Sequence, residues 1–225
     1  MISLSAQRPL FLPDFYFFYR IFASDIFLLA DHLRFRKQSA IVRTKIISKI
    51  TPYYLTVPVK HNKIYPHPPL KEVKLFSDNF WRERHLKTIK SIYQKFPYFE
   101  EYFDSLQLIY NRQHFYLLDF LLDLIKWHTD LLFPEKKIIL SSEVKINDLE
   151  DLRGWIRQLE WPTLLYYEHE INYYHTNLAE FRKTPIFIKE KQLMKLPSEY
   201  QPELTFLILL FLKGPESKLF FDYSR

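Results

Sequence analysis

Three residues carry the clearest acid–base chemistry in this 225-residue sequence: a histidine in a basic segment and an aspartate–histidine pair. His85 lies four residues after Trp81, among several Lys and Arg residues. Positive neighbours lower the pKa of a histidine, so a neutral His85 ring could accept a proton near pH 7. Asp31 and His32 directly follow Asp25–Ala30, an apolar run typical of a buried strand. We predict that all three are catalytic, with His85 in a cleft and within side-chain reach of Asp31 or His32.

Each of these residues also has a structural interpretation. His85 could be a half-buried ring that packs on Trp81 and donates one hydrogen bond, and Asp31 could be a turn residue. Ligands usually bind at the carboxyl ends of the strands in an open α/β sheet, which favours a functional Asp31.

Basic residues follow the aspartate–histidine pair closely. Arg34, Lys37 and Arg43 lie within ten residues of each other, and Arg82 lies in the basic segment that contains His85. A guanidinium group suits bidentate recognition of phosphate or carboxylate. We predict that these four residues bind substrate, although a solvated basic surface would give the same pattern.

The charge is divided unevenly along the chain. The net charge is +6, with +10 in the first hundred residues and −4 in the remainder. A basic half favours anionic partners such as nucleotides, sugar phosphates, nucleic acid or acidic lipid. The alternative is that the two halves pack together through complementary surfaces.

The composition excludes several chemistries. The chain has no cysteine, so thiolate nucleophiles, disulfides and cysteine-ligated metals are impossible. It has two glycines, too few for a glycine-rich phosphate loop. Glu168–Glu170 and His175 lack the H-E-x-x-H spacing of a zinc site, and His61 and His67 lie in a proline-rich loop, so we expect no metal and no cofactor. Ser141–Glu143 could cap the turn or helix that follows, because no nucleophile elbow surrounds these serines.

The predicted secondary structure that positions these residues changes at Ser77, from mostly strands before it to helices after it. Short strands are predicted in the first 78 residues, with one early helix, and helical periodicity follows up to residue 133. The predicted strands are Asp25–Ala30, Ile41–Ile50, Tyr53–Val59 and Val73–Phe76. The predicted helices are Phe15–Ala23, Phe80–Phe96, Phe99–Tyr110, Gln113–Leu132, Leu149–Leu159 and Leu204–Lys213.

This order predicts an α/β or α+β fold, with a small sheet in the N-terminal third covered by helices and a helical C-terminal two-thirds. We expect one compact unit with a core of residues 1–143 and a helical extension of residues 144–225. The most apolar run, Leu204–Leu212, has nine residues, and a membrane span needs about 20. No signal peptide is visible, so we expect a cytoplasmic protein without a membrane span.

Several segments resemble, in order and spacing, the motifs of the WbqC-like family. The resemblance is dense over residues 7–143 and patchy beyond them. The segments that carry it most clearly are Pro9–Pro13 (PLFLP), Asp25–Phe27 (DIF), Thr56–Val59 (TVPV), Trp81–Ile89 (WRERHLKTI), Pro97–Phe99 (PYF) and Gly214–Pro215 (GP).

The resemblance implies a role in polysaccharide or O-antigen biosynthesis, with acyl or aminoacyl transfer to an amino-sugar as the suggested reaction. The implied ligand is a nucleotide sugar or sugar phosphate. Several positions of the family pattern are replaced in this chain, since Arg8, Tyr16, His32, Arg34 and Val42 stand where the family has Gln, Gly, Asp, Gln and Asn. Three hypotheses therefore stay open: a transferase, a non-catalytic scaffold of a biosynthetic assembly and, least favoured, a binder of single-stranded nucleic acid.

Overall fold

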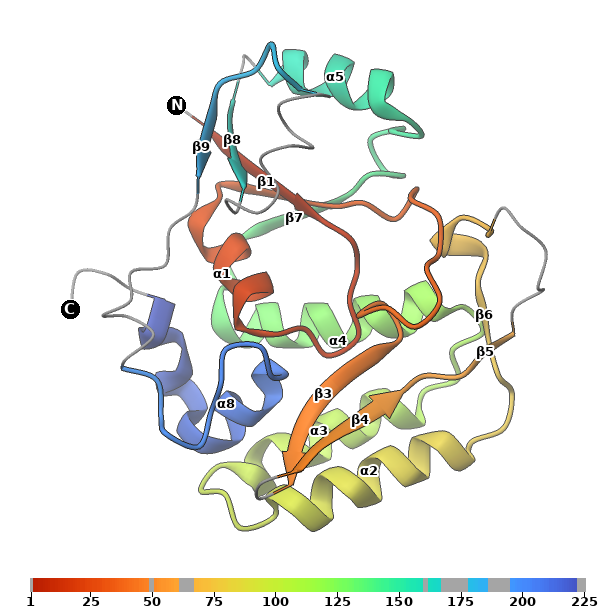
Figure 1. Ribbon diagram of the computed structural model, residues 1–225, viewed down its shortest axis with the longest axis vertical. Helices are drawn as coiled ribbons and strands as arrows, with labels where there is room; N and C mark the ends of the chain where they lie inside the picture. Colours follow the sequence, from red (N-terminus) through yellow and green to blue (C-terminus); the bar gives the residue numbers. More distant parts are fainter. Residues whose placement is uncertain are drawn as a thin grey trace.

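A parallel sheet of five strands, in the order β7-β2-β1-β8-β9, lies at one end of the molecule (Figure 1). The computed structural model describes residues 2–48, 51–60, 67–159, 162–166, 178–185 and 195–221. The strands of the sheet are β1 (Ser3–Gln7), β2 (Ile26–Leu29), β7 (Lys137–Leu140), β8 (Thr163–Tyr166) and β9 (Lys183–Pro185). Every neighbouring pair runs parallel.

The mixed α/β class is confirmed, but the sheet is not confined to the N-terminal third. Strands β7, β8 and β9 come from residues after 136, and β7 and β8 pair with strands from the first 29 residues, while β9 pairs with β8. Pro134 and Lys136–Lys137 interrupt the sequence pattern just before and at the start of β7, and β8 and β9 are only four and three residues long, too short to show a periodicity. The division between residues 1–143 and 144–225 stays a prediction, and strands from both ranges share the sheet.

Two antiparallel strand pairs lie outside the main sheet. The larger pairs β3 (Arg43–Ser48) with β4 (Thr51–Thr56), and the smaller pairs β5 (Val59–Lys60) with β6 (Lys74–Leu75). The apolar–polar alternation in this region therefore marks strands, as predicted.

Helices cover the sheet and build the rest of the molecule. The helices are α1 (Phe15–Ala23), α2 (Phe80–Tyr93), α3 (Phe99–Asn111), α4 (Leu117–Leu132), α5 (Leu149–Gln158) and α8 (Phe206–Lys213), with 3-10 turns η1 (Leu70–Glu72) and η3 (Gly214–Phe221). The carboxylate of Asp14 caps α1 by accepting a hydrogen bond from the Phe17 N–H at 3.0 Å. The predicted helical stretch of residues 79–133 is confirmed as α2, α3 and α4.

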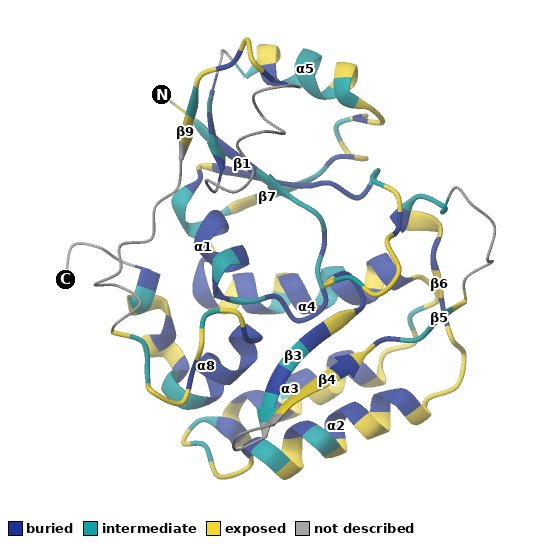
Figure 2. Ribbon diagram, in the orientation of Figure 1, coloured by how far each residue is buried: buried dark blue, intermediate teal, exposed yellow. Residues whose placement is uncertain are grey.

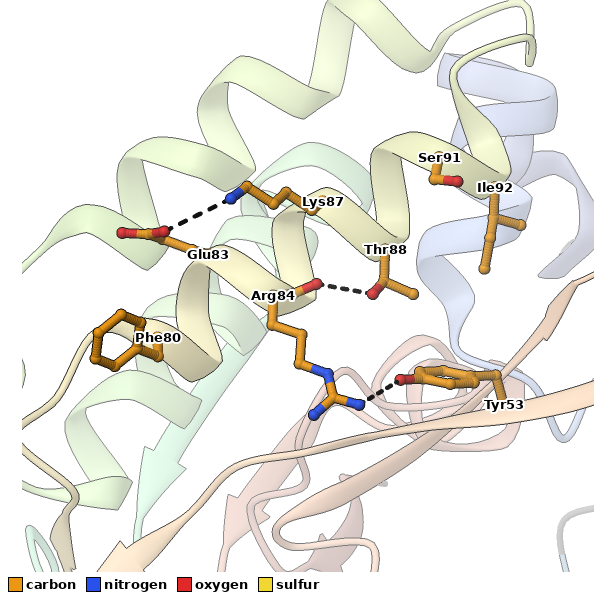
Figure 3. A pocket seen from close by; sticks show the side chains of 8 residues that line it. All are labelled: Tyr53, Phe80, Glu83, Arg84, Lys87, Thr88, Ser91 and Ile92. Atoms are coloured by element: carbon orange, nitrogen blue, oxygen red, sulfur yellow. Dashed lines mark hydrogen bonds and ion pairs between the residues drawn. The ribbon is translucent and has the colours of Figure 1, made fainter.

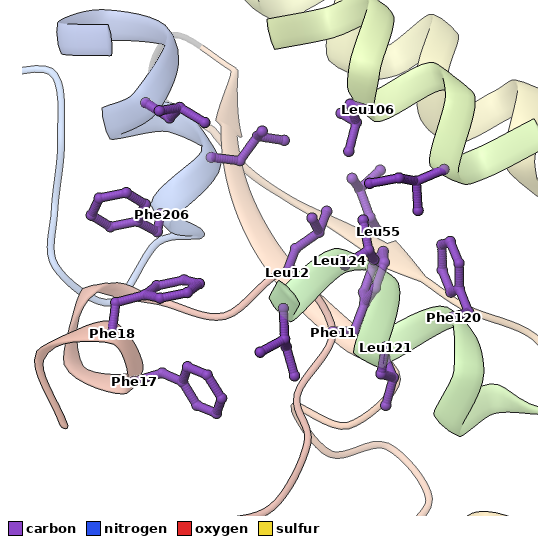
Figure 4. Packing of buried hydrophobic residues seen from close by; sticks show 14 of the residues in the cluster. Phe11, Leu12, Phe17, Phe18, Leu55, Leu106, Phe120, Leu121, Leu124 and Phe206 are labelled. Atoms are coloured by element: carbon purple, nitrogen blue, oxygen red, sulfur yellow. The ribbon is translucent and has the colours of Figure 1, made fainter. Parts of the chain in front are cut away.

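An aromatic core fills the space beneath the sheet. In Figure 4, Phe18 of α1 lies near Phe206 of α8, with Phe17 beside Phe18, while Phe120 of α4 lies near Phe11. Helix α4 buries one face against this core and exposes the other, whereas every residue of α1 and α8 is buried or partly buried (Figure 2). Among the described residues, no helix combines the length and apolar character needed to cross a bilayer.

Candidate functional site

The carboxyl ends of β2 and β7 bring together a small polar cluster. Asp31 follows β2 by two residues, and Ser141 follows β7 directly. Because these strands are parallel neighbours, their carboxyl ends meet at one edge of the sheet, where ligands of α/β folds usually bind. The Ser141 hydroxyl donates to Asp31 Oδ1 at 2.5 Å, and His32 Nδ1 lies 2.7 Å from the same hydroxyl oxygen.

This hydrogen-bond chain assigns the tautomer of His32. A serine hydroxyl has one proton, and Ser141 gives it to the Asp31 carboxylate, which can only accept. The Ser141 oxygen must then accept a hydrogen bond from the Nδ1–H of His32. The lone pair of the neutral ring consequently lies on Nε2. Among the described residues this Nε2 has no hydrogen-bond partner, and it is not a buried atom.

The charges of the cluster follow from its surroundings. Burial raises the pKa of Asp31, but hydrogen bonds from Ser141 and Ser142 outweigh it and hold the pKa below its usual value. One of these bonds comes from the Ser142 N–H at 2.9 Å. Burial lowers the pKa of His32, although the negative charge of Asp31 opposes this. Near pH 7 the cluster thus combines an ionised carboxylate with a neutral imidazole.

His32 opens into a pocket of about 460 Å³ at this edge of the sheet. Arg34 and Lys71 line the pocket with exposed cationic side chains, and Asp148 lines it from the start of α5. The Arg34 guanidinium donates to the carbonyl oxygen of His67 at 2.8 Å, which fixes its position at the rim. The arrangement offers a base next to two positive charges, as proton transfer on an anionic substrate requires.

Ser141 has a different role from the predicted cap. Its side chain is fully buried, and its hydroxyl binds Asp31 instead of the turn that follows. The carboxylate of Glu143 accepts a hydrogen bond from the Leu140 N–H at 3.1 Å. Because the Ser141 hydroxyl is buried and its proton is donated to Asp31, Ser141 positions His32 and is not a nucleophile. Sequence reasoning missed this role because 109 residues separate Ser141 from His32, and β7 was not recognised.

His85 is among the residues that line a pocket between strand β4 and helix α2, but it does not line the His32 pocket. Its ring is 5% exposed and packs against Trp81 and Phe11. Its nitrogens make hydrogen bonds with the Tyr110 hydroxyl, at 3.4 Å from Nδ1, and with the backbone of Thr56. Burial, not the neighbouring cations, is the main cause that lowers the pKa of His85 to about 4. Within the described part of the chain, neither Asp31 nor His32 is among the contacts of His85. A catalytic role for His85 therefore stays a prediction.

Two of the predicted cations, Arg82 and Arg43, do not line the His32 pocket. The Arg82 guanidinium is buried and donates to the carbonyl oxygens of Tyr110, at 2.6 Å, and Arg112, at 3.0 Å. Its setting is therefore that of a structural residue. Arg43 is exposed, with its guanidinium carbon 3.7 Å from the ring centroid of Tyr54.

No described pocket unites the predicted cations with His85. Lys37 is exposed and, like Arg43, does not line the His32 pocket. Of the four predicted substrate-binding residues, only Arg34 lies at that pocket. A role in substrate binding for Lys37 and Arg43 stays a prediction.

A metal ion has no evident site in the described ranges. These residues contain no group of three or more histidine, aspartate or glutamate side chains that could hold one. Glu168–Glu170, His175 and His61 lie outside the described residues.

Comparisons with known proteins identify one family. The model of the WbqC-like protein family matches residues 8–219, which is nearly the whole chain. No curated protein and no solved structure matches the chain.

Proposed function

The chain belongs to the WbqC-like protein family, and from this premise we propose that it is a transferase of surface-polysaccharide biosynthesis, acting on a nucleotide-linked or phosphorylated sugar. Family membership by itself suggests only a role related to polysaccharide biosynthesis. The finer proposal rests on one observation, the hydrogen-bond chain from Asp31 through Ser141 to His32, which leaves Nε2 as a proton acceptor beside the pocket.

His32 acts as the general base in this proposal. A hydroxyl or amine of the acceptor attacks the electrophilic carbon of the donor, and its proton moves to Nε2 of His32. The new bond forms between the acceptor heteroatom and that carbon. The bond from the carbon to the leaving group breaks, and its electron pair departs with the leaving group. His32 then returns the proton to the leaving group or to water.

Asp31 and Ser141 support this step without touching the substrate. When His32 becomes an imidazolium, the Asp31 charge stabilises it through the Ser141 hydroxyl, and the same bonds hold the ring in one tautomer. Arg34 and Lys71 line the same pocket and supply the positive charge for a phosphate or diphosphate group. The first hundred residues of the chain carry a net charge of +10, which favours the binding of an anionic ligand of this kind.

Purified protein tests the proposal directly. We would incubate it with nucleotide sugars, acyl donors and amino-sugar acceptors, and detect transfer by mass spectrometry. Wild-type protein should produce a product, and His32→Gln should reduce the rate by about 10²–10⁴-fold, the usual contribution of a general base. Arg34→Ala should mainly raise KM, because its charge binds the donor. A His32→Gln variant with the wild-type rate would refute the role of His32.

A non-catalytic scaffold is the second candidate function. The burial of His85 and Arg82 favours it, because two polar residues of the resembling segment are part of the core. If the protein is a scaffold, wild type and His32→Gln should bind the partner proteins of the assembly equally well. Co-purification of the same partners by both variants, with no transfer by either, would support the scaffold.

A further inference from the structure

A second groove runs between strand β4 and helix α2, away from the residues that line the His32 pocket (Figure 3). Two adjoining pockets of about 530 and 490 Å³ form it. Both are lined by Tyr53, Phe80, Arg84 and Thr88, so they make one continuous depression.

Aromatic rings stand exposed along this groove. Phe80, at the start of α2, is 80% exposed, and Tyr53 of β4 is 37% exposed. Trp81 lines the second pocket beside them. Figure 3 shows Phe80 and Tyr53 at opposite ends of the depression, with Arg84 between them. The two rings provide apolar platforms along the groove for an extended, partly apolar ligand.

Hydrogen-bonding groups surround these rings. The Arg84 guanidinium reaches across the groove and donates to the Tyr53 hydroxyl at 3.3 Å, as Figure 3 shows. The Thr88 hydroxyl donates to the Arg84 carbonyl oxygen at 2.7 Å, which leaves its oxygen free to accept. The hydroxyl of Ser91 and the carboxylate of Glu83 line the same side. The groove thus offers donors and acceptors at the edges of an aromatic platform.

The charges of the groove are mixed. Lys87 pairs with Glu83 at 3.8 Å, and Asp78 lines the second pocket. Arg84 is therefore accompanied by two carboxylates. A phosphodiester strand needs a track of unneutralised cations, and carboxylates along the groove repel it. A ligand that carries many hydroxyl groups and little charge fits better.

We infer that the groove between β4 and α2 binds a saccharide chain. The apolar faces of the sugar rings pack on Phe80 and Tyr53, and the hydroxyl groups at the ring edges bind Arg84, Glu83 and Thr88. This inference goes beyond the proposed function, because it concerns a separate surface and does not require that His32 be catalytic.

Calorimetry with defined oligosaccharides tests the inference. The probes are neutral hexasaccharides of glucose and of N-acetylglucosamine, an oligogalacturonate as an acidic chain, and a fifteen-residue oligothymidylate. We expect saturable binding of at least one neutral saccharide and weaker binding of the oligogalacturonate, because Glu83 and Asp78 line the groove. Phe80→Ala and Tyr53→Ala should each weaken the binding of the neutral saccharide roughly three- to tenfold, the usual value of an aromatic contact.

Phe115→Ala is the matched control, since this ring is 68% exposed but lines neither pocket. It should leave binding unchanged, and circular dichroism should show that all variants fold. The inference is overturned if wild-type protein binds no saccharide at millimolar concentrations, or if Phe80→Ala binds as tightly as wild type. Binding of the oligothymidylate alone, with strong salt dependence, would also overturn it and assign the groove to a nucleic-acid strand.

Discussion

Removing the Ser141 hydroxyl should destabilise the protein through Asp31. The Asp31 carboxylate is 1% exposed, and the Ser141 hydroxyl and the Ser142 N–H both donate to Oδ1. In Ser141→Ala the side chain keeps nearly the same volume, but the hydroxyl's bond to the buried Asp31 charge and the bond that it accepts from His32 are both lost. The bond to the buried charge is the larger of the two losses. Such a bond contributes about 1.5–3 kcal/mol to the free energy of unfolding. For a chain of this length, each kcal/mol corresponds to about 2–4 °C in Tm.

The pH dependence of this loss provides a second measurement. The pKa of Asp31 is lowered in the folded protein, so its stabilising contribution is complete above the unfolded pKa of about 3.9. The contribution is lost as pH falls through the lower, folded pKa. The part of the difference between wild type and Ser141→Ala that comes from Asp31 should therefore be constant from pH 7 to pH 5, and the comparison is made in a His32→Gln background so that His32 does not titrate. It should shrink only in more acidic solution.

Urea unfolding followed by circular dichroism measures both effects. Ser217→Ala is the matched control, because the Ser217 side chain is fully buried and its hydroxyl has no hydrogen-bond partner among the described residues. This control should be neutral or slightly stabilising, since no bond is lost. The reasoning is refuted if Ser141→Ala unfolds within about 0.5 kcal/mol of wild type at pH 7, or if the two variants lose equal stability.

Three further predictions concern the supporting structure. Gly214→Ala should destabilise the protein by about 1–3 kcal/mol, because φ is +52° and a Cβ there would lie 2.5 Å from Tyr98 Cδ1; urea unfolding measures this. Tyr93→Phe should cost about 1–3 kcal/mol in the same assay, because the Tyr93 hydroxyl donates to the Ile47 carbonyl at 2.9 Å and accepts from the Ile47 N–H at 3.1 Å. Burial lowers the pKa of His128 to about 4, so between pH 6.5 and 4 the unfolded state binds its proton and the folded state does not. Stability should fall there as pH decreases, and His128→Gln should reduce the slope by about 1.4 kcal/mol per pH unit.

Each of these predictions has a defined contrary result, which for Tyr93→Phe is a free energy of unfolding within about 0.5 kcal/mol of wild type. Gly154→Ala is the control for Gly214→Ala, because nothing lies within 4 Å of its Cβ position in α5. This control should stabilise the helix by about 0.5–1 kcal/mol. Equal effects at the two glycines would contradict the clash with Tyr98. An unchanged pH slope in His128→Gln would show that this ring is charged in the folded state.

The helices were accessible from the sequence because their signals are local. Asp119, Asp123 and Asp130 recur at helical spacing against an apolar face, and α4 forms across them. Asp14 and Thr205 supply side-chain caps at the starts of α1 and α8. Strands β1, β7 and β8 carry no comparable signal. Each is four or five residues long, and its hydrogen-bond partners lie far away in the chain, so only the assembled sheet shows that it is a strand.

The candidate site shows the same division. That Asp31 and His32 follow a buried strand, and so lie where ligands usually bind, was readable from the residues alone. That Ser141 connects them depended on the pairing of β2 with β7, which joins residues more than 100 positions apart. The sequence determined which residue types were available and excluded thiol and glycine-loop chemistry. Tertiary packing decided which of them act together: burial beneath Trp81 removed His85 from the group, because the exposure and partners of a side chain depend on elements that are distant in the chain.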